Sequence, residues 1–124
     1  MANRAIIGIT DWAATQAQVR DVARRIDAGA VLPAGDYYLG FANAAQLLAE
    51  LPPRRLDTLR AVKRLGPVSI YAVAKALARN YSNVHADVQK LIEHGLVDKQ
   101  PDGRVTVPWA DVVVKLDASL LSAA

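Results

Sequence analysis

Apolar residues in the middle of the chain recur at the spacing of two short helices. The first set, at i, i+3, i+4 and i+7, consists of Ile70, Val73, Ala74 and Leu77. The second set, at i, i+4, i+7 and i+8, consists of Val84, Val88, Leu91 and Ile92. Each spacing places the apolar side chains on one face of a helix and leaves the other positions to solvent. The sequence therefore predicts two consecutive amphipathic helices, the second from about Ser82 to His94.

Polar and turn-forming residues mark the ends of the second helix. The break at residues 79–82 supplies Asn and Ser, whose side chains can accept the unpaired backbone N–H groups at the start of a helix. Gly95 is suited to end the helix, because glycine adopts positive φ at little cost. Short apolar runs at 96–97 and 105–107 then flank a Pro-Asp-Gly turn signal. The predicted order is helix, tight turn, helix and hairpin.

This order is that of a winged helix-turn-helix. Residues 53–108 resemble the winged helix-turn-helix domains of bacterial and archaeal transcriptional regulators. Residues 83–97 are similar to the recognition helix and wing entry of MarR-like regulators. The similarity lies in the spacing of two valines, a Leu-Ile pair and a Gly-Leu-Val run, at positions 84, 88, 91–92 and 95–97. The whole chain also resembles small antitoxin-like DNA-binding regulators, in which an α/β N-terminal segment precedes the winged domain.

The rest of the chain predicts three strands and three further helices. Strand signals lie at 5–10, 37–41 and 112–116, and the last lacks alternation, which predicts burial on both faces. Its partner is either the opening strand or a second copy of the chain. Helices are expected over about 12–28, after Asn43 and from Pro53 to about Leu65. The helix after Asn43 carries Leu47, Leu48 and Leu51. In the helix from Pro53 the expected inward positions are Leu56, Leu59, Val62 and Leu65, and the outward ones are Arg54, Arg55, Arg60, Lys63 and Arg64.

The predicted fold class is therefore α+β, a winged helix-turn-helix with a small α/β N-terminal extension. Residues 1–52 would form the extension, used for dimerisation or partner contact. Residues 53–124 would form the DNA-binding domain with its C-terminal strand.

Charge is unevenly distributed along the 124 residues. The net charge is +3, but residues 53–108 hold ten basic and five acidic side chains, a net +5. The basic excess thus falls in the segment that resembles a DNA-binding domain, as contact with phosphate requires. No run approaches the roughly 20 apolar residues of a membrane helix, and there is neither a cysteine nor a signal-peptide pattern. We expect a soluble, cytoplasmic protein.

Catalytic chemistry is not expected. The two histidines, His85 and His94, lack metal-ligand spacing, and the chain has no glycine-rich phosphate loop. We therefore expect no enzyme activity, no metal and no cofactor.

The expected site is an interface with double-stranded DNA. The second helix of a helix-turn-helix presents its first residues to base edges in the major groove, where Asn and Gln can bond adenine and Ala can touch a thymine methyl. The expected base-reading residues are Ser82, Asn83, His85, Ala86 and Gln89. The expected backbone contacts are Tyr71, Lys75, Arg79, Tyr81 and Lys90, with Lys99 and Arg104 on the wing, about 96–107.

Two other function classes remain open. An antitoxin would bind its own operator and also a toxin protein, with Tyr37–Phe41 and the flanking helices as the candidate surface. A winged helix can also serve protein contact alone, although the basic excess argues against this. We expect a homodimer, because regulators with two-fold symmetry present a pair of recognition helices about 34–36 Å apart. The apolar runs Ile6–Ile9 and Val112–Leu116 are the expected interface.

Overall fold

The structure, a computed structural model, describes residues 3–9 and 35–116. These residues form helices and strands in a mixed α+β arrangement, which confirms the coarser part of the predicted fold class. The helix expected over about 12–28 lies outside the described residues. The chain divides into two compact units, one made of Asn3–Leu47 with Ala110–Ala124 and the other of Leu48–Trp109. Each unit is considered by itself.

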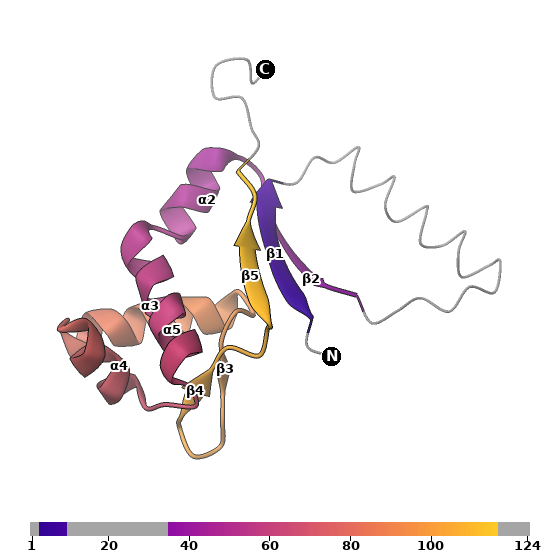
Figure 1. Ribbon diagram of the computed structural model, residues 1–124. Coiled ribbons are helices and arrows are strands. Elements are labelled where there is room, and N and C mark those ends of the chain that lie inside the picture. Colours follow the sequence, from indigo (N-terminus) through magenta and orange to yellow (C-terminus); the bar gives the residue numbers. More distant parts are fainter. Residues whose placement is uncertain (1–2, 10–34, 117–124) are drawn as a thin grey trace. The chain divides into compact units, whose positions relative to one another are not determined.

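The first unit contains a three-stranded parallel sheet (Figure 1). Strands β1 (Arg4–Ile9), β2 (Tyr37–Phe41) and β5 (Asp111–Val114) lie in the order β2-β1-β5. In its register Ala5 lies opposite Tyr37 on one side and opposite Val112 on the other. The central position of β1 explains its apolar sequence, because Ala5 and Ile7 are fully buried.

Strand β5 differs from expectation in its burial. It does pair with the opening strand, which was one of the two partners considered. The prediction that this strand is buried on both faces is wrong, however, because Val112 and Val113 are half-buried and Val114 is 42% exposed. The reason is its position, since β5 lies at the edge of a sheet of three strands. This pairing also groups residues 110–116 with the first unit, whereas the predicted division placed them with residues 53–109.

Helix α2 (Ala44–Glu50) follows β2. Its start is capped as expected, because the side-chain oxygen of Asn43 accepts a 2.8 Å hydrogen bond from the backbone N–H of Gln46. Leu47 and Leu51 are buried, but Leu48 is exposed. Leu47 and Leu51 are four residues apart and share a face, whereas Leu48 is turned away from that face by about 100°.

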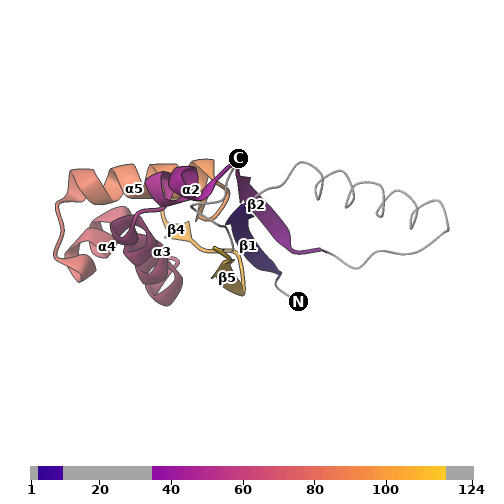
Figure 2. The same ribbon diagram turned by 90° about the horizontal axis from the view of Figure 1, so that it is seen from above.

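The second unit contains three packed helices and a hairpin (Figures 1 and 2). Helix α3 (Pro53–Leu65) packs against both α4 (Ile70–Leu77) and α5 (Tyr81–Glu93), which also pack against each other. Strands β3 (Asp98–Lys99) and β4 (Val105–Thr106) pair antiparallel, and an isolated bridge joins Val68 to Val105. The buried apolar side chains of the three helices are Leu59, Ala61, Val62, Ile70, Val73, Ala74, Val84, Val88 and Leu91.

The connection between α4 and α5 is tight. Ala78 adopts a left-handed conformation with φ of 53°, and the side chain of Asn80 caps α5 by accepting a 2.8 Å hydrogen bond from the N–H of Ser82. At the other end of α5, Gly95 has the expected positive φ of 76°. The cap at Asn80 and the helix end at Gly95 were predicted from the sequence, whereas the left-handed conformation of Ala78 was not.

Helix α3 shows two departures from the predicted faces. Leu65 was expected inward but is exposed, since it is the last residue of the helix and extends beyond the packed turns. Arg55 was expected outward but its side chain is only 17% exposed. It points into the helical unit because a buried carboxylate, described below, lies opposite it.

Candidate functional site

The five expected base-reading residues all lie on α5, on or beside its solvent-facing side. Ser82, Asn83 and Ala86 are exposed, and His85 and Gln89 are half-buried. This placement follows from the apolar spacing, because the buried residues of α5 occupy the opposite side against α3 and α4. The structure therefore brings these residues together on a single helix surface.

His85 is held by an aromatic neighbour. Its ring centroid lies 5.8 Å from that of Tyr81, one turn earlier, with the ring planes tilted by 37°. Offset or tilted ring pairs at such distances are favourable. The contact lies at the start of α5, where Tyr81 is itself exposed.

The expected backbone contacts lie on three elements of the same unit. Tyr71 and Lys75 are exposed on α4, and Lys90 is exposed on α5, where it forms an ion pair with Glu93 at 3.4 Å. On the hairpin, Lys99 and Arg104 are both exposed. Four of these five carry the positive charge that a phosphate-binding surface needs, and Tyr71 offers a hydroxyl.

Arg104 is bonded within its own hairpin. Its Nε lies 2.7 Å from a carboxylate oxygen of Asp102, and its backbone N–H donates to the other oxygen at 3.0 Å. The backbone hydrogen bond from Arg104, followed by the one from its side chain, lowers the pKa of Asp102 below its ordinary value. Both side chains are about half exposed, so this pair is open to exchange with solvent or with another anion.

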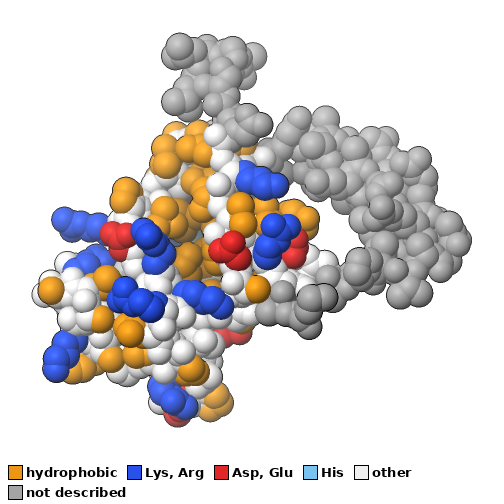
Figure 3. All heavy atoms as spheres, in the orientation of Figure 1, with side chains coloured by type: hydrophobic (Ala, Val, Ile, Leu, Met, Phe, Trp, Pro, Cys, Tyr) orange, Lys and Arg blue, Asp and Glu red, His pale blue; other side chains and the backbone are white. Residues whose placement is uncertain are grey.

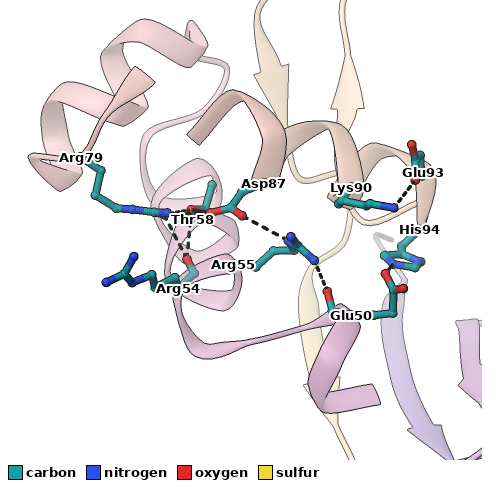
Figure 4. Close-up of polar contacts among 9 residues, drawn as sticks. All are labelled: Glu50, Arg54, Arg55, Thr58, Arg79, Asp87, Lys90, Glu93 and His94. Carbon is teal, nitrogen blue, oxygen red and sulfur yellow. Dashed lines mark hydrogen bonds and ion pairs between the residues drawn. The ribbon is translucent and has the colours of Figure 1, made fainter. Parts of the chain in front are cut away.

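Arg79 is directed into the unit rather than to solvent. Its Nη1 donates to a carboxylate oxygen of Asp87 at 2.9 Å and to the hydroxyl of Thr58 at 2.9 Å, and the side chain is only 21% exposed (Figure 4). These contacts tie the turn after α4 to both α3 and α5. The expectation that Arg79 holds DNA phosphate is therefore revised, since its guanidinium group already serves an internal carboxylate.

Asp87 is the centre of a buried polar network. Its carboxylate also accepts from the Nε of Arg55 at 3.2 Å and lies 3.2 Å from the hydroxyl of Thr58. Arg55 continues the network by donating from Nη1 to the backbone carbonyl of Glu50 at 2.6 Å. Burial of a charge is tolerated only when it is paired and hydrogen-bonded, and the Asp87 carboxylate meets that condition with two arginines and a hydroxyl.

A side-chain hydrogen bond extends the same network at the end of α5. The Nε2 of His94 lies 3.2 Å from a carboxylate oxygen of Glu50 (Figure 4). The backbone carbonyl of the same residue accepts the hydrogen bond from Arg55. The middle of α5, at Asp87, and its C-terminal cap, at His94, are thus bonded to the preceding elements.

Sequence reasoning did not assign a role to Asp87. The available signal was its position, since Asp87 falls three residues after Val84 and four before Leu91, within the buried stripe of α5. An acidic residue in an apolar stripe predicts a buried partner of opposite charge. Residues 53–108 hold ten basic side chains, and no local pattern distinguishes the partner of Asp87 among them.

The basic residues of the second unit are not confined to the α5 side. Figure 3 shows Lys and Arg side chains gathered over α3, on the face that it presents to the viewer. Because α5 packs against the buried side of α3, the exposed side of α3 points away from α5. The exposed basic residues of α3 are Arg54, Arg60, Lys63 and Arg64. The excess charge of this segment is therefore spread over more than one side of the unit.

Residues 3–9 and 35–116 contain neither a metal-binding cluster nor a membrane-spanning helix. Within them, no group of three or more His, Cys, Asp or Glu side chains is placed to hold a metal ion. None of the helices described there is long and apolar enough to cross a membrane.

Comparison with known proteins places the chain in a family. The HVO_A0114 family model matches residues 50–114, which is more than half of the 124 residues. The chain belongs to the HVO_A0114 family. The matched segment runs from the end of α2 through the helices and hairpin to the last residue of β5. No curated protein and no solved structure matches the chain.

Proposed function

We propose that the protein is a sequence-specific transcriptional regulator that binds double-stranded DNA through a winged helix-turn-helix. Support comes from the element order of the second unit. The order is helix α3, the isolated bridge residue Val68, helices α4 and α5, and the two strands of the hairpin β3–β4. In this proposal α5 enters the major groove and the hairpin, about residues 96–107, contacts the DNA backbone.

The observation that carries the proposal is that the exposed start of α5 bears no acidic side chain. A helix of about 10–12 Å diameter fits a major groove about 12 Å wide, but acidic side chains facing the groove would be repelled by phosphate. The exposed start of α5 carries Ser82, Asn83 and Ala86, which are small and uncharged. Asp87 is the acidic residue nearest to them in α5, and its charge is buried against two arginines.

Individual roles follow from side-chain chemistry. Asn83 and Gln89 can each donate and accept towards the N6 and N7 of adenine, and Ala86 can contact a thymine methyl. Ser82 and His85 can each form one further hydrogen bond to a base edge or a phosphate. These five side chains carry no fixed positive charge, so in this proposal they contribute sequence preference rather than the general attraction to DNA.

Attraction to the phosphate backbone is assigned to exposed side chains around α5. These are Tyr71, Lys75, Tyr81, Lys90, Lys99 and Arg104. Arg104 would exchange its Asp102 partner for a phosphate oxygen, which is feasible because the pair is half exposed. Arg79 instead acts from behind α5, where it holds Asp87 in place.

The experiment that tests this function is selection of bound DNA from a random duplex pool, followed by sequencing. The proposal predicts enrichment of a short motif by the wild-type chain and loss of that enrichment in the Asn83→Ala/Gln89→Ala double variant. A pool that remains random after repeated rounds with folded wild-type protein would rule out sequence-specific binding.

An antitoxin role is the second candidate, and one feature of the first unit favours it. Tyr38 is 68% exposed on β2, which lies at an edge of the described sheet. Edge strands with exposed side chains can accept a strand from another protein. A toxin partner would add to this edge and leave α5 available for DNA. Loss of toxin binding on Tyr38→Asp substitution, with DNA binding unchanged, is the result expected of such a protein.

A further inference from the structure

Strand β5 has a partner on one side in the described sheet. The strand order β2-β1-β5 gives β1 a neighbour on each edge, so its Ile6–Ile9 run is already paired within the chain. Among residues 3–9 and 35–116, β5 is paired with β1 alone. Of the two runs expected at a dimer interface, Val112–Leu116 is therefore the one with an available backbone edge.

The direction of the β5 backbone groups is fixed by one hydrogen bond. The N–H of Lys115 donates to the carbonyl of Ile7 in β1 at 2.7 Å. Backbone groups alternate in direction along a strand, so the N–H and C=O groups of residues 111, 113 and 115 point towards β1. Residues 112 and 114 then direct their N–H and C=O groups to the outer edge.

The charges of this strand are arranged symmetrically about Val113. Asp111 and Lys115 lie two residues before and two residues after it, and both are exposed. Arg4, which lies opposite Asp111 in β1, is bonded to Asp36 at 3.1 Å. A two-fold axis at Val113 would place each Asp111 opposite the Lys115 of another copy.

We propose that the outer edge of β5 pairs antiparallel with the same edge of a second copy of this chain, about a two-fold axis at Val113. Val112 and Val114 then form hydrogen-bonded pairs with their counterparts, and Val113 faces itself in a non-hydrogen-bonded pair. This agrees with the alternation of wide and narrow pairs in an antiparallel ladder. The two sheets join into one sheet of six described strands.

The self-complementary charge pattern selects a second copy as the partner. In this register the interface contains two Asp111–Lys115 pairs, and opposite charges directly across a strand pair are favourable. A parallel or shifted register would lose this match, and a one-residue shift would also reverse the side-chain faces. Contact with Val112 of the other copy would reduce the solvent exposure of the Val114 side chain, which is 42% in the single chain.

One contact must exchange when the strands pair. In the single chain, the carboxylate of Asp111 accepts a 2.8 Å hydrogen bond from the N–H of Val112, one of the outward groups. On pairing, that N–H donates to the carbonyl of Val114 in the second copy, and the carboxylate turns to Lys115. The hydrogen bond to Asp111 shows that this N–H is not used in pairing with β1.

The proposal stands independently of DNA binding. Where the proposed function also holds, the dimer supplies the second copy of α5 that a two-fold operator requires. The assembly is measured without DNA, so failure of either claim can be recognised separately.

Charge reversal tests the register. In sedimentation equilibrium at micromolar concentration, the wild-type chain is expected to dimerise. Asp111→Lys and Lys115→Asp should each weaken the dimer about tenfold, since each places two like-charge pairs across the interface. The double variant restores opposite charges and should restore dimerisation. The matched controls, Asp98→Lys and Lys99→Asp, change net charge equally on the hairpin and should dimerise as wild type does.

A cross-link gives a second measurement that does not depend on charge. The chain contains no cysteine, so Val113→Cys introduces a single thiol. In the proposed register the two thiols face each other at a distance that a disulfide can span, and diamide should give a covalent dimer. Lys115→Cys places its thiols at opposite ends of the paired strands and should remain uncross-linked. A monomeric wild-type chain, a double charge variant as weak as the single ones, or equal cross-linking of both cysteine variants would overturn the proposal.

Discussion

The Nη1 of Arg79 lies 2.9 Å from a carboxylate oxygen of Asp87, which joins the turn after α4 to the middle of α5. Arg55 of α3 reaches the other oxygen of the same carboxylate at 3.2 Å. Three helical elements of the second unit therefore meet at one buried charge. Because α5 carries the proposed base-reading residues, this network fixes the surface on which they are presented.

Removal of the Asp87 charge should destabilise the fold. Asp87→Ala leaves two partly buried guanidinium groups without their carboxylate, and the expected loss is about 2–4 kcal/mol in the free energy of unfolding. Urea denaturation followed by circular dichroism measures it. Asp57→Ala is the matched control, because its pair with Arg60 at 3.7 Å is exposed and should contribute less than about 1 kcal/mol. Equal effects of the two substitutions would contradict a structural role for Asp87.

Substitutions on the exposed side of α5 should alter sequence preference. Asn83→Ala or Gln89→Ala is expected to cost about 1–3 kcal/mol on the best selected duplex, with little loss on random DNA. The physical reason is that a base contact made by an amide is lost while the charge of the protein stays the same. Fluorescence anisotropy with both duplexes measures the difference. Equal losses on the two DNAs would show that these residues do not read bases.

Substitutions of exposed lysines around α5 should weaken all DNA binding alike. Lys75→Ala or Lys99→Ala is expected to reduce affinity for specific and random duplexes equally and to lower the salt slope by about one unit. Arg60→Ala is the matched control, because Arg60 is exposed on the side of α3 that points away from α5. If Arg60→Ala alone changed the salt slope, the DNA would lie on the α3 side instead.

The hairpin should show a pH-dependent contact. Arg104 lowers the pKa of Asp102, so the bond contributes when Asp102 is ionised and is lost as pH falls through its depressed folded-state pKa. Carboxyl titration by NMR should place the pKa of Asp102 below its ordinary value. In Arg104→Ala the pKa of Asp102 should rise towards that value, because the side-chain bond to its carboxylate is removed. An unchanged pKa would mean that this bond does not form in solution.

Local patterns predicted the helices well. The apolar spacing of α4 and α5 requires no knowledge of distant residues, and Val84, Val88 and Leu91 are buried as it implied. The cap at Asn80 and the positive φ at Gly95 follow from residue chemistry in the same way. Such features are decided within one or two turns of the chain.

Contacts between distant residues were not predictable from those patterns. Arg55 and Arg79 looked like surface residues because their partner, Asp87, is 32 and 8 residues away. Leu65 was expected to point inward because an apolar residue on a helix does not reveal where the neighbouring elements end. The exposure of Val114 likewise depends on its edge position in the sheet, which only the pairing of β5 with β1 establishes.

The central claim is that the second unit binds duplex DNA through charged contacts around α5. The most direct measurement is the affinity of the full chain for the best selected duplex at a series of salt concentrations. With Lys75, Lys90, Lys99 and Arg104 on phosphate, log K should fall linearly with log salt, with a slope of about −3 to −4 for each bound copy. Affinity that does not change with salt, or absence of binding by folded protein at low salt, would contradict it.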